Sequence, residues 1–189
     1  MMANVLIFAD HDGGKVAKTA AELASFAKRG GTPIAALLTD SSQADSLASQ
    51  LANTDIESVL AVENSDFAKH GIPALVDALA QVIEAKKPDA VLIPSTARGK
   101  EIAGRLAVRI NSGIITDAID VAADFGTTQS VFGGSFTVSA KVKTGIPVIT
   151  VRPSSIEAST TSNTPAVEKL NVTVSDRAKL VTISNVQPA

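Results

Sequence analysis

The sequence predicts an α/β fold in which a mostly parallel sheet carries helices on both faces and is extended by antiparallel strands in its C-terminal third. Short apolar runs alternate with helical repeats as far as Ile110, as in buried parallel strands joined by crossover helices. Beyond Gly113, strand-like segments follow each other too closely for intervening helices, which favours antiparallel pairing. A chain of 189 residues with 45% hydrophobic residues can bury a sizeable core.

The first strand–helix–strand unit opens the chain. Val5–Ala9 is a continuous apolar run and predicts a central strand. Apolar residues then recur at three- and four-residue steps over Lys15–Lys28, which predicts a helix that ends at Gly30-Gly31. Pro33–Leu38 is the second strand. This order of elements predicts a Rossmann-like arrangement with a right-handed crossover.

The same alternation continues through two further units. We expect Ser41 or Ser42 to cap a helix that runs through Ala52, and Ser58–Val62 to form the third strand. A helix is predicted over Ala74–Lys86, because its apolar residues lie on one stripe. The fourth strand, a polar turn and another helix complete this part of the chain, at Ala90–Pro94, Ser95–Lys100 and Glu101–Ile110.

The C-terminal third changes its pattern. Gly113–Val121 begins as a strand, and Ser130–Phe132, Ser135–Val142 and Pro147–Val151 follow at short spacing. We expect these strands to pair antiparallel or to return to the sheet edge.

The chain is expected to divide into three parts. Residues 1–153 form an α/β nucleotide-binding-like domain. Residues 154–166 are rich in Ser and Thr and poor in apolar side chains, which predicts a flexible loop or linker. Residues 167–189 contain two alternating segments, Val167–Val174 and Leu180–Val186, which predict terminal strands.

Composition excludes several function classes. The chain has no cysteine and 2 histidines, which excludes thiolate metal sites and makes a histidine-rich metal site implausible. A net charge of −2 and the lack of Trp and Tyr argue against a nucleic-acid partner. The opening residues lack a basic signal segment and no apolar run is long enough for a membrane helix, so we expect a soluble protein of the bacterial cytoplasm.

Three loops follow the strands, at the edge where ligands bind in open α/β sheets. Asp10–Lys15 contains Gly13-Gly14 but matches no phosphate-binding motif, and its acidic residues favour a tight turn with a helix cap. Thr39–Ser42 is typical of a helix cap.

The third loop is the most suggestive, because hydroxyl and cationic groups converge there on a helix N-terminus. The groups are Ser95, Thr96, Arg98, Gly99 and Lys100, with Arg105 further along the helix. One interpretation is a nucleotide or phosphate site, or the remnant of one. The other is a capped helix with solvated cations, in which Arg105 pairs with Glu101 or faces a partner.

Catalytic residues are not apparent in the sequence. His11 and His70 have no recognisable ligand spacing and are interpreted as loop histidines. Ser135 follows Gly133-Gly134, but this segment is not a nucleophile elbow. Because no pair of titratable residues is spaced as a general acid and a general base, we expect no catalytic site. Because the histidines lack ligand spacing, we expect no metal site either.

Several segments, in order, resemble the alpha subunit of electron-transfer flavoproteins. They cover most of the chain and comprise Val5–Asp10, Pro94–Ala107, Ile115–Ile119, Val131–Ser135 and Val142–Pro153. The resemblance implies the N-terminal domain of that subunit. In the family a second domain follows, announced by a glycine-rich motif, and the present sequence stops at Ala189 before such a motif.

The resemblance implies an electron carrier and not an enzyme. FAD is expected in the full-length protein, held mainly by the domain absent from this chain, so no cofactor is expected here. The implied partners are the beta subunit, dehydrogenases and a quinone reductase. The Ser95–Lys100 loop would then be a vestigial nucleotide site or a partner-facing turn.

Two alternatives remain beside this scaffold function. A small adenine-nucleotide-binding protein would use the Ser95–Lys100 loop, and a hydrolase is the weakest hypothesis because no nucleophile–base pair is visible. Without a partner domain, an exposed apolar patch should also cause weak self-association of the chain.

Overall fold

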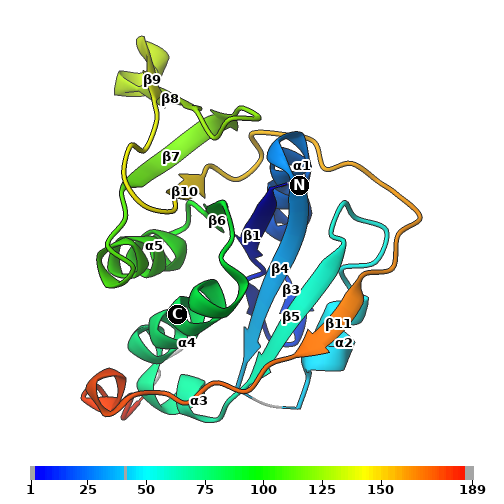
Figure 1. Cartoon of the computed structure of the whole chain (residues 1–189), viewed down its shortest axis with the longest axis vertical. Coiled ribbons are helices and arrows are strands. Elements are labelled where there is room, and N and C mark those ends of the chain that lie inside the picture. Colours follow the sequence, from blue (N-terminus) through cyan, green and yellow to red (C-terminus); the bar gives the residue numbers. More distant parts are fainter. Residues whose placement is uncertain (1–2, 41, 186–189) are drawn as a thin grey trace.

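One large sheet runs through the computed structural model, which describes residues 3–40 and 42–185 (Figure 1). Nine strands pair in the order β11-β5-β4-β1-β6-β10-β7-β8-β9 within these residues. Neighbours from β11 to β7 run parallel, whereas β7–β8 and β8–β9 are antiparallel. The predicted mostly parallel sheet with an antiparallel extension is confirmed. The bounds are β1 Asn4–Phe8, β4 Thr32–Thr39, β5 Ser58–Glu63, β6 Ala90–Pro94, β7 Ile114–Val121, β8 Thr127–Val131, β9 Phe136–Ala140, β10 Val148–Val151 and β11 Ala166–Lys169.

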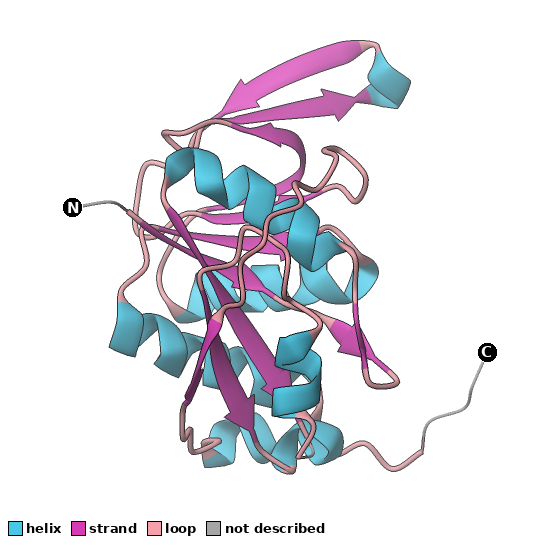
Figure 2. Cartoon of the chain, turned by 90° about the vertical axis from the view of Figure 1, so that its right-hand side faces the viewer, coloured by secondary structure: helices cyan, strands magenta, loops and turns pink. Residues whose placement is uncertain are grey.

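Helices cover both faces of the sheet, as predicted (Figure 2). Residues alternate between the faces along β1: Leu6 and Phe8 pack with α4 and α5, whereas Val5 and Ile7 pack with α1 and α2. This period of two is the geometry of an extended strand. The helices are α1 Thr19–Gly30, α2 Ala44–Ser49, α3 Asp66–His70, α4 Ile72–Lys86 and α5 Ala97–Arg109, with short 3-10 turns η1 Phe132–Gly134 and η2 Asp176–Lys179.

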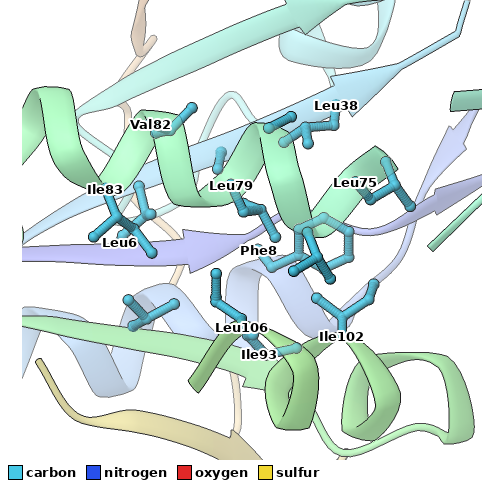
Figure 3. Packing of buried hydrophobic residues seen from close by; sticks show 14 of the residues in the cluster. Leu6, Phe8, Leu38, Leu75, Leu79, Val82, Ile83, Ile93, Ile102 and Leu106 are labelled. Carbon is cyan, nitrogen blue, oxygen red and sulfur yellow. The ribbon is translucent and has the colours of Figure 1, made fainter. Parts of the chain in front are cut away.

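The face under α4 and α5 carries the larger apolar cluster (Figure 3). Leu79 of α4 and Leu106 of α5 are fully buried beside Phe8 of β1. Burial of one such side chain contributes about 1.5–3 kcal/mol, so the strands and these helices stabilise each other.

The position of β10 corrects one prediction. The segment Pro147–Val151 was expected to pair antiparallel or to lie at the sheet edge, but β10 runs parallel between β6 and β7. All four residues of β10 are buried, as required of a strand covered on both faces. The chain leaves the body after β7, forms β8 and β9, and then returns to the interior of the sheet.

Several element boundaries also differ from prediction. A small hairpin, β2 His11–Asp12 and β3 Lys15–Val16, precedes α1, so α1 begins at Thr19 and not at Lys15. No side-chain bond from Gln43 caps α2, and Ser42 is not its cap; the backbone N–H of Ala44 instead donates to Glu63 Oε1 at 3.1 Å. Ser41 lies outside the described residues. The helix α3 was not predicted.

Residues 152–165 link β10 to β11 along the α1 face, where Ile156 packs against the apolar cluster. The backbone N–H of Ser159 donates to Ser25 Oγ at 2.9 Å, and the amide of Asn163 donates to the carbonyl of Ile56. These bonds attach the segment to the domain at several points. The division of the chain at 153 and 166 stays a prediction.

The last described residues correct a further prediction. Leu180–Val186 was expected to be a strand, but residues 180–185 form none, and Val186 lies outside the described residues. Here η2 precedes an extended segment whose Ile183 N–H donates to the Lys69 carbonyl at 2.8 Å. Within the described residues, no helix is long and apolar enough to cross a membrane.

Candidate functional site

The strand order reverses between β1 and β6. From β1 the chain builds outward through β4 and β5, and from β6 it builds in the other direction toward β7. The loops after β1 and β6 therefore face each other at the carboxyl edge, where ligands bind in open α/β sheets. An ion pair joins them, with Arg98 Nη1 3.0 Å from Asp10 Oδ1.

A cavity of about 700 Å³ opens beside this ion pair. Its walls combine the β2–β3 hairpin, the α3–α4 junction with Phe67, and the first turns of α5 with Arg98 and Arg105. Val181 and Ile183 line its rim and are held there by α3, since the Val181 carbonyl lies 2.8 Å from His70 Nδ1. The cavity is the candidate ligand site that the topology indicates.

The loop after β6 is shorter than predicted. Only Ser95 and Thr96 connect β6 to α5, and Ala97–Lys100 already form the first helical turn. Thr96 Oγ1 accepts a hydrogen bond from the Gly99 N–H at 3.0 Å, which is an N-cap bond. A Cβ on Gly99 would lie 1.9 Å from the Pro94 carbonyl oxygen, so the glycine permits close contact of helix and strand.

The predicted cations are all matched by carboxylates of this chain. Arg98 pairs with Asp10, and Arg105 Nη2 lies 2.9 Å from Glu101 Oε1, as the four-residue spacing predicted. Lys100 Nζ lies 4.0 Å from Asp117 Oδ1. Because these charges are matched internally, the loop offers little net positive charge to a phosphate. The alternative function as a small adenine-nucleotide-binding protein is not supported.

A polar network extends from Ser95 to β7 and β10. Ser95 Oγ donates to Asp117 Oδ1 at 3.1 Å and accepts from the buried Thr150 Oγ1 at 3.1 Å. The Asp117 N–H donates to Thr150 Oγ1 at 2.9 Å. Arg152 Nη2 donates to Asp117 Oδ2 at 2.6 Å and to the Ser130 carbonyl at 3.1 Å.

The network stabilises the ionised form of Asp117. Its hydrogen bond from Arg152, reinforced by that from Ser95, lowers the pKa of the Asp117 carboxyl although burial opposes this. Asp117 and Arg152 were not among the predicted site residues. The sequence did offer a signal for both residues. Asp117 is a charged residue within the strand Ile114–Val121, and Arg152 directly follows the apolar strand Val148–Val151.

Neither the N-terminus of α1 nor that of α5, the helices that follow β1 and β6, fits the diphosphate of a flavin dinucleotide. The β2–β3 hairpin separates β1 from α1, so the direct strand-to-helix turn of dinucleotide-binding folds is interrupted. Asp12 lies within the hairpin, Asp10 is paired with Arg98, and Thr96 occupies an amide of α5. We therefore assign no flavin contact to these residues.

The remaining predicted candidates have structural contacts. His11 Nε2 lies 2.8 Å from the Leu38 carbonyl, and His70 contacts Val181 as described above. Ser135 caps η1, the turn between β8 and β9. Among residues 3–40 and 42–185, no group of three or more metal-ligating side chains is found.

A second candidate surface lies on the β8–β9 arm, defined as residues 127–140, which projects from the body (Figures 1 and 2). Phe132 is 82% exposed, Phe136 62% and Val138 41%. The two phenyl rings meet edge to face with centroids 5.7 Å apart. Of the described strands, β9 is the outermost on this side of the sheet. Clustered exposed apolar groups of this kind mark interaction sites.

Comparison with known proteins gives a consistent result. A family model described as "Electron transfer flavoprotein domain" matches residues 5–175. "Electron transfer flavoprotein subunit alpha" of Mycobacterium tuberculosis is 40% identical over 157 residues, covering 83% of this chain and 49% of the relative. The subunits of the same name from Syntrophomonas wolfei and Bacillus subtilis are 33% and 31% identical, covering 89% and 69% of this chain and 54% and 42% of those relatives. The chain spans about half the length of these curated relatives.

Proposed function

Since the chain belongs to the electron transfer flavoprotein domain family, we propose that it is the N-terminal scaffold and subunit-interaction domain of an alpha-type subunit. The family match spans all the large strands of the sheet, including β11. The sheet and its helices therefore act together as the support, with the β8–β9 arm as the surface that meets a partner.

The redox function belongs to the whole protein. In the full-length subunit, FAD is held mainly by the portion of the longer relatives that this chain does not cover, and it supplies the electron-accepting chemistry. The electrons come from dehydrogenases and pass to a quinone reductase, so the protein is an electron carrier and not an enzyme. We place it in the bacterial cytoplasm, since the relatives compared above are bacterial.

The observation that carries the interaction function is the apolar surface of the arm. Phe132, Phe136 and Val138 are large exposed apolar side chains on a single hairpin. The outer edge of β9 also presents backbone groups to which another strand can add. A beta-type subunit is the expected occupant, because the relatives are named as one subunit, alpha, of an electron carrier.

Titration with a beta-type subunit tests this proposal. The chain should form a complex, and the double variant Phe132→Ser/Phe136→Ser should weaken it by about tenfold or more, since each ring contributes on the scale of an interface anchor. Val108→Ser is the matched control, because Val108 is equally exposed but lies on α5. Equal weakening by the control variant, or no complex with the unmodified chain, would refute the proposal.

Purification of the chain alone tests the cofactor assignment. Flavin absorbance should not co-purify with it, because the β2–β3 hairpin interrupts the turn before α1 and Thr96 already caps α5. Tightly bound FAD in the isolated chain would show that the assignment of the flavin site is wrong.

A further inference from the structure

We propose that Arg152 is a positioning residue that sets the direction of the β8–β9 arm for partner docking. The inference rests on the proposed function and identifies how the fold aims the surface that the partner meets. Arg152 forms what we term the arginine latch with two acceptors, the Asp117 carboxylate and the Ser130 carbonyl.

The latch lies at the bend of β7, beyond which the strand pairs with β8 as well as with β10. The first half of β7 pairs with β10, with Ile114 and Ile115 beside Val148 and Ile149, and Ala118 beyond the bend still lies beside Val151. The end of β7 pairs with β8 in the arm, through Ala118 to Val121. The register is irregular on both sides of this strand, and Asp117 between the two halves has a φ of 62°. Such an interruption bends a strand and increases its twist.

A bend alone does not fix an angle, and Arg152 adds a constraint beside that of Gln129, whose side-chain amide donates to the Thr116 carbonyl at 2.6 Å. Arg152 follows β10 in the body and reaches both the bend at Asp117 and the arm at Ser130. One planar guanidinium thus ties three strands together, and it does so through two charge-assisted hydrogen bonds of fixed direction.

The predicted loop after β6 supports the latch from below. Ser95 Oγ donates to the second oxygen of Asp117, and Lys100 Nζ lies 4.0 Å from that oxygen. Ser95 and Lys100, two residues of the predicted vestigial ligand site, therefore position the Asp117 carboxylate that accepts the bond from Arg152.

The other end of β7 is anchored separately. Arg29 Nη1 lies 2.7 Å from Asp120 Oδ1 and donates to the Val121 carbonyl at 3.2 Å. A Cβ on Gly30 would lie 2.7 Å from a ring carbon of Phe125, so α1 and the β7–β8 turn are in close contact. With this end fixed, the latch adds the contact that joins Ser130 of β8 directly to the residue after β10.

The latch is poorly placed to stabilise the fold. The side chains of Arg152 and Asp117 are 41% and 37% exposed, and exposed ion pairs contribute little to folding. Its loss should therefore change the direction of the arm while the domain remains folded.

Distances between spin labels test this without a partner. The chain has no native cysteine, so Ser135→Cys at the arm and Ala85→Cys on α4 can be labelled selectively. We expect a narrow distance distribution in the otherwise unmodified chain and a clearly broader one with Arg152→Gln. Lys28→Gln, which breaks a similarly exposed pair with Glu57, is the control and should leave the distribution narrow. An unchanged distribution in Arg152→Gln would overturn the proposal.

Binding to the beta-type subunit tests the consequence. Arg152→Gln should weaken binding by about tenfold and lower the melting temperature only slightly, with partial rescue by Arg152→Lys, which restores the charge without the planar guanidinium. If the unmodified chain binds and Arg152→Gln binds equally well, the latch is refuted alone. If the unmodified chain fails to bind, the proposed function is refuted, and the docking role with it.

Discussion

Gly99→Ala should destabilise the domain although alanine favours helices. Gly99 lies in the first turn of α5, against the Pro94 carbonyl of β6. A Cβ there would lie 1.9 Å from that oxygen, whereas contacts below 3.0 Å are essentially never seen. The helix must therefore move about 1 Å away from the sheet. This movement loosens the packing of the buried side chains Ile102 and Leu106.

The magnitude follows from two opposing effects. Replacing glycine by alanine in a helix gains about 1 kcal/mol. Forcing an extra carbon against backbone costs about 3 kcal/mol, at the upper end of the overpacking range because a carbonyl cannot rotate away. The free energy of unfolding should therefore fall by about 2 kcal/mol. For a chain of this size, the melting temperature should fall by about 4–8 °C.

Gly104→Ala on the same helix is the matched control. A Cβ at Gly104 would meet nothing within 4 Å, so the same substitution should raise the free energy of unfolding by about 0.5–1 kcal/mol. Urea and thermal unfolding of both variants decide the point. If Gly99→Ala is neutral or stabilising, as expected for Gly104→Ala, the reasoning from close approach is wrong.

Three further predictions concern the network, the connecting segment and the arm. The lowered pKa of Asp117 means that its ion pair with Arg152 stabilises the fold above the ordinary pKa of 3.8, and that this stabilisation is lost as the pH falls through the lower folded-state pKa. In urea unfolding at neutral pH, Arg152→Gln should lower the free energy of unfolding by less than about 1 kcal/mol. This difference should vanish in acid, and a difference that persists there would contradict the pairing. Asn163→Ala should lower the free energy of unfolding by about 1 kcal/mol and accelerate proteolysis within residues 154–166. An unchanged cleavage rate would show that the hydrogen bond from Asn163 to the Ile56 carbonyl does not restrain that segment. The unmodified chain should self-associate weakly in light scattering and Phe136→Ser should reduce this, whereas a monomer at high concentration would contradict the prediction.

Much of the fold could be predicted because burial is encoded locally. The runs in β1, β4 and β6 are short and apolar at successive positions, which is typical of a strand covered on both faces. The position of β10 within the sheet depends instead on contacts with β6 and β7, which are distant in the sequence. Its fully apolar composition was the available signal for an interior strand.

Other errors have equally local causes. Val16 continues the three- and four-residue spacing of α1, so the β2–β3 hairpin was absorbed into the predicted helix. Leu180–Ile183 alternates like a strand, but within the described residues no neighbouring strand pairs with it, and α3 holds it instead. The β-propensity of a segment depends on its own residues, whereas a strand forms only where a second strand is available to pair with it.

The candidate site was predicted in part. The residues after β6 do converge on a helix N-terminus, and it is capped as one of the two interpretations held, with Thr96 as the cap. Their partners could not be read from spacing, because Asp10 and Asp117 lie far from Arg98 and Ser95 along the chain. The charges are therefore matched within the fold, whereas the sequence alone left them available to a ligand.

Sedimentation of the chain with a beta-type subunit decides whether this domain is an interaction domain. At micromolar concentrations, we expect a single faster-sedimenting species of one chain with one beta-type subunit. Two species sedimenting independently at every concentration would contradict it.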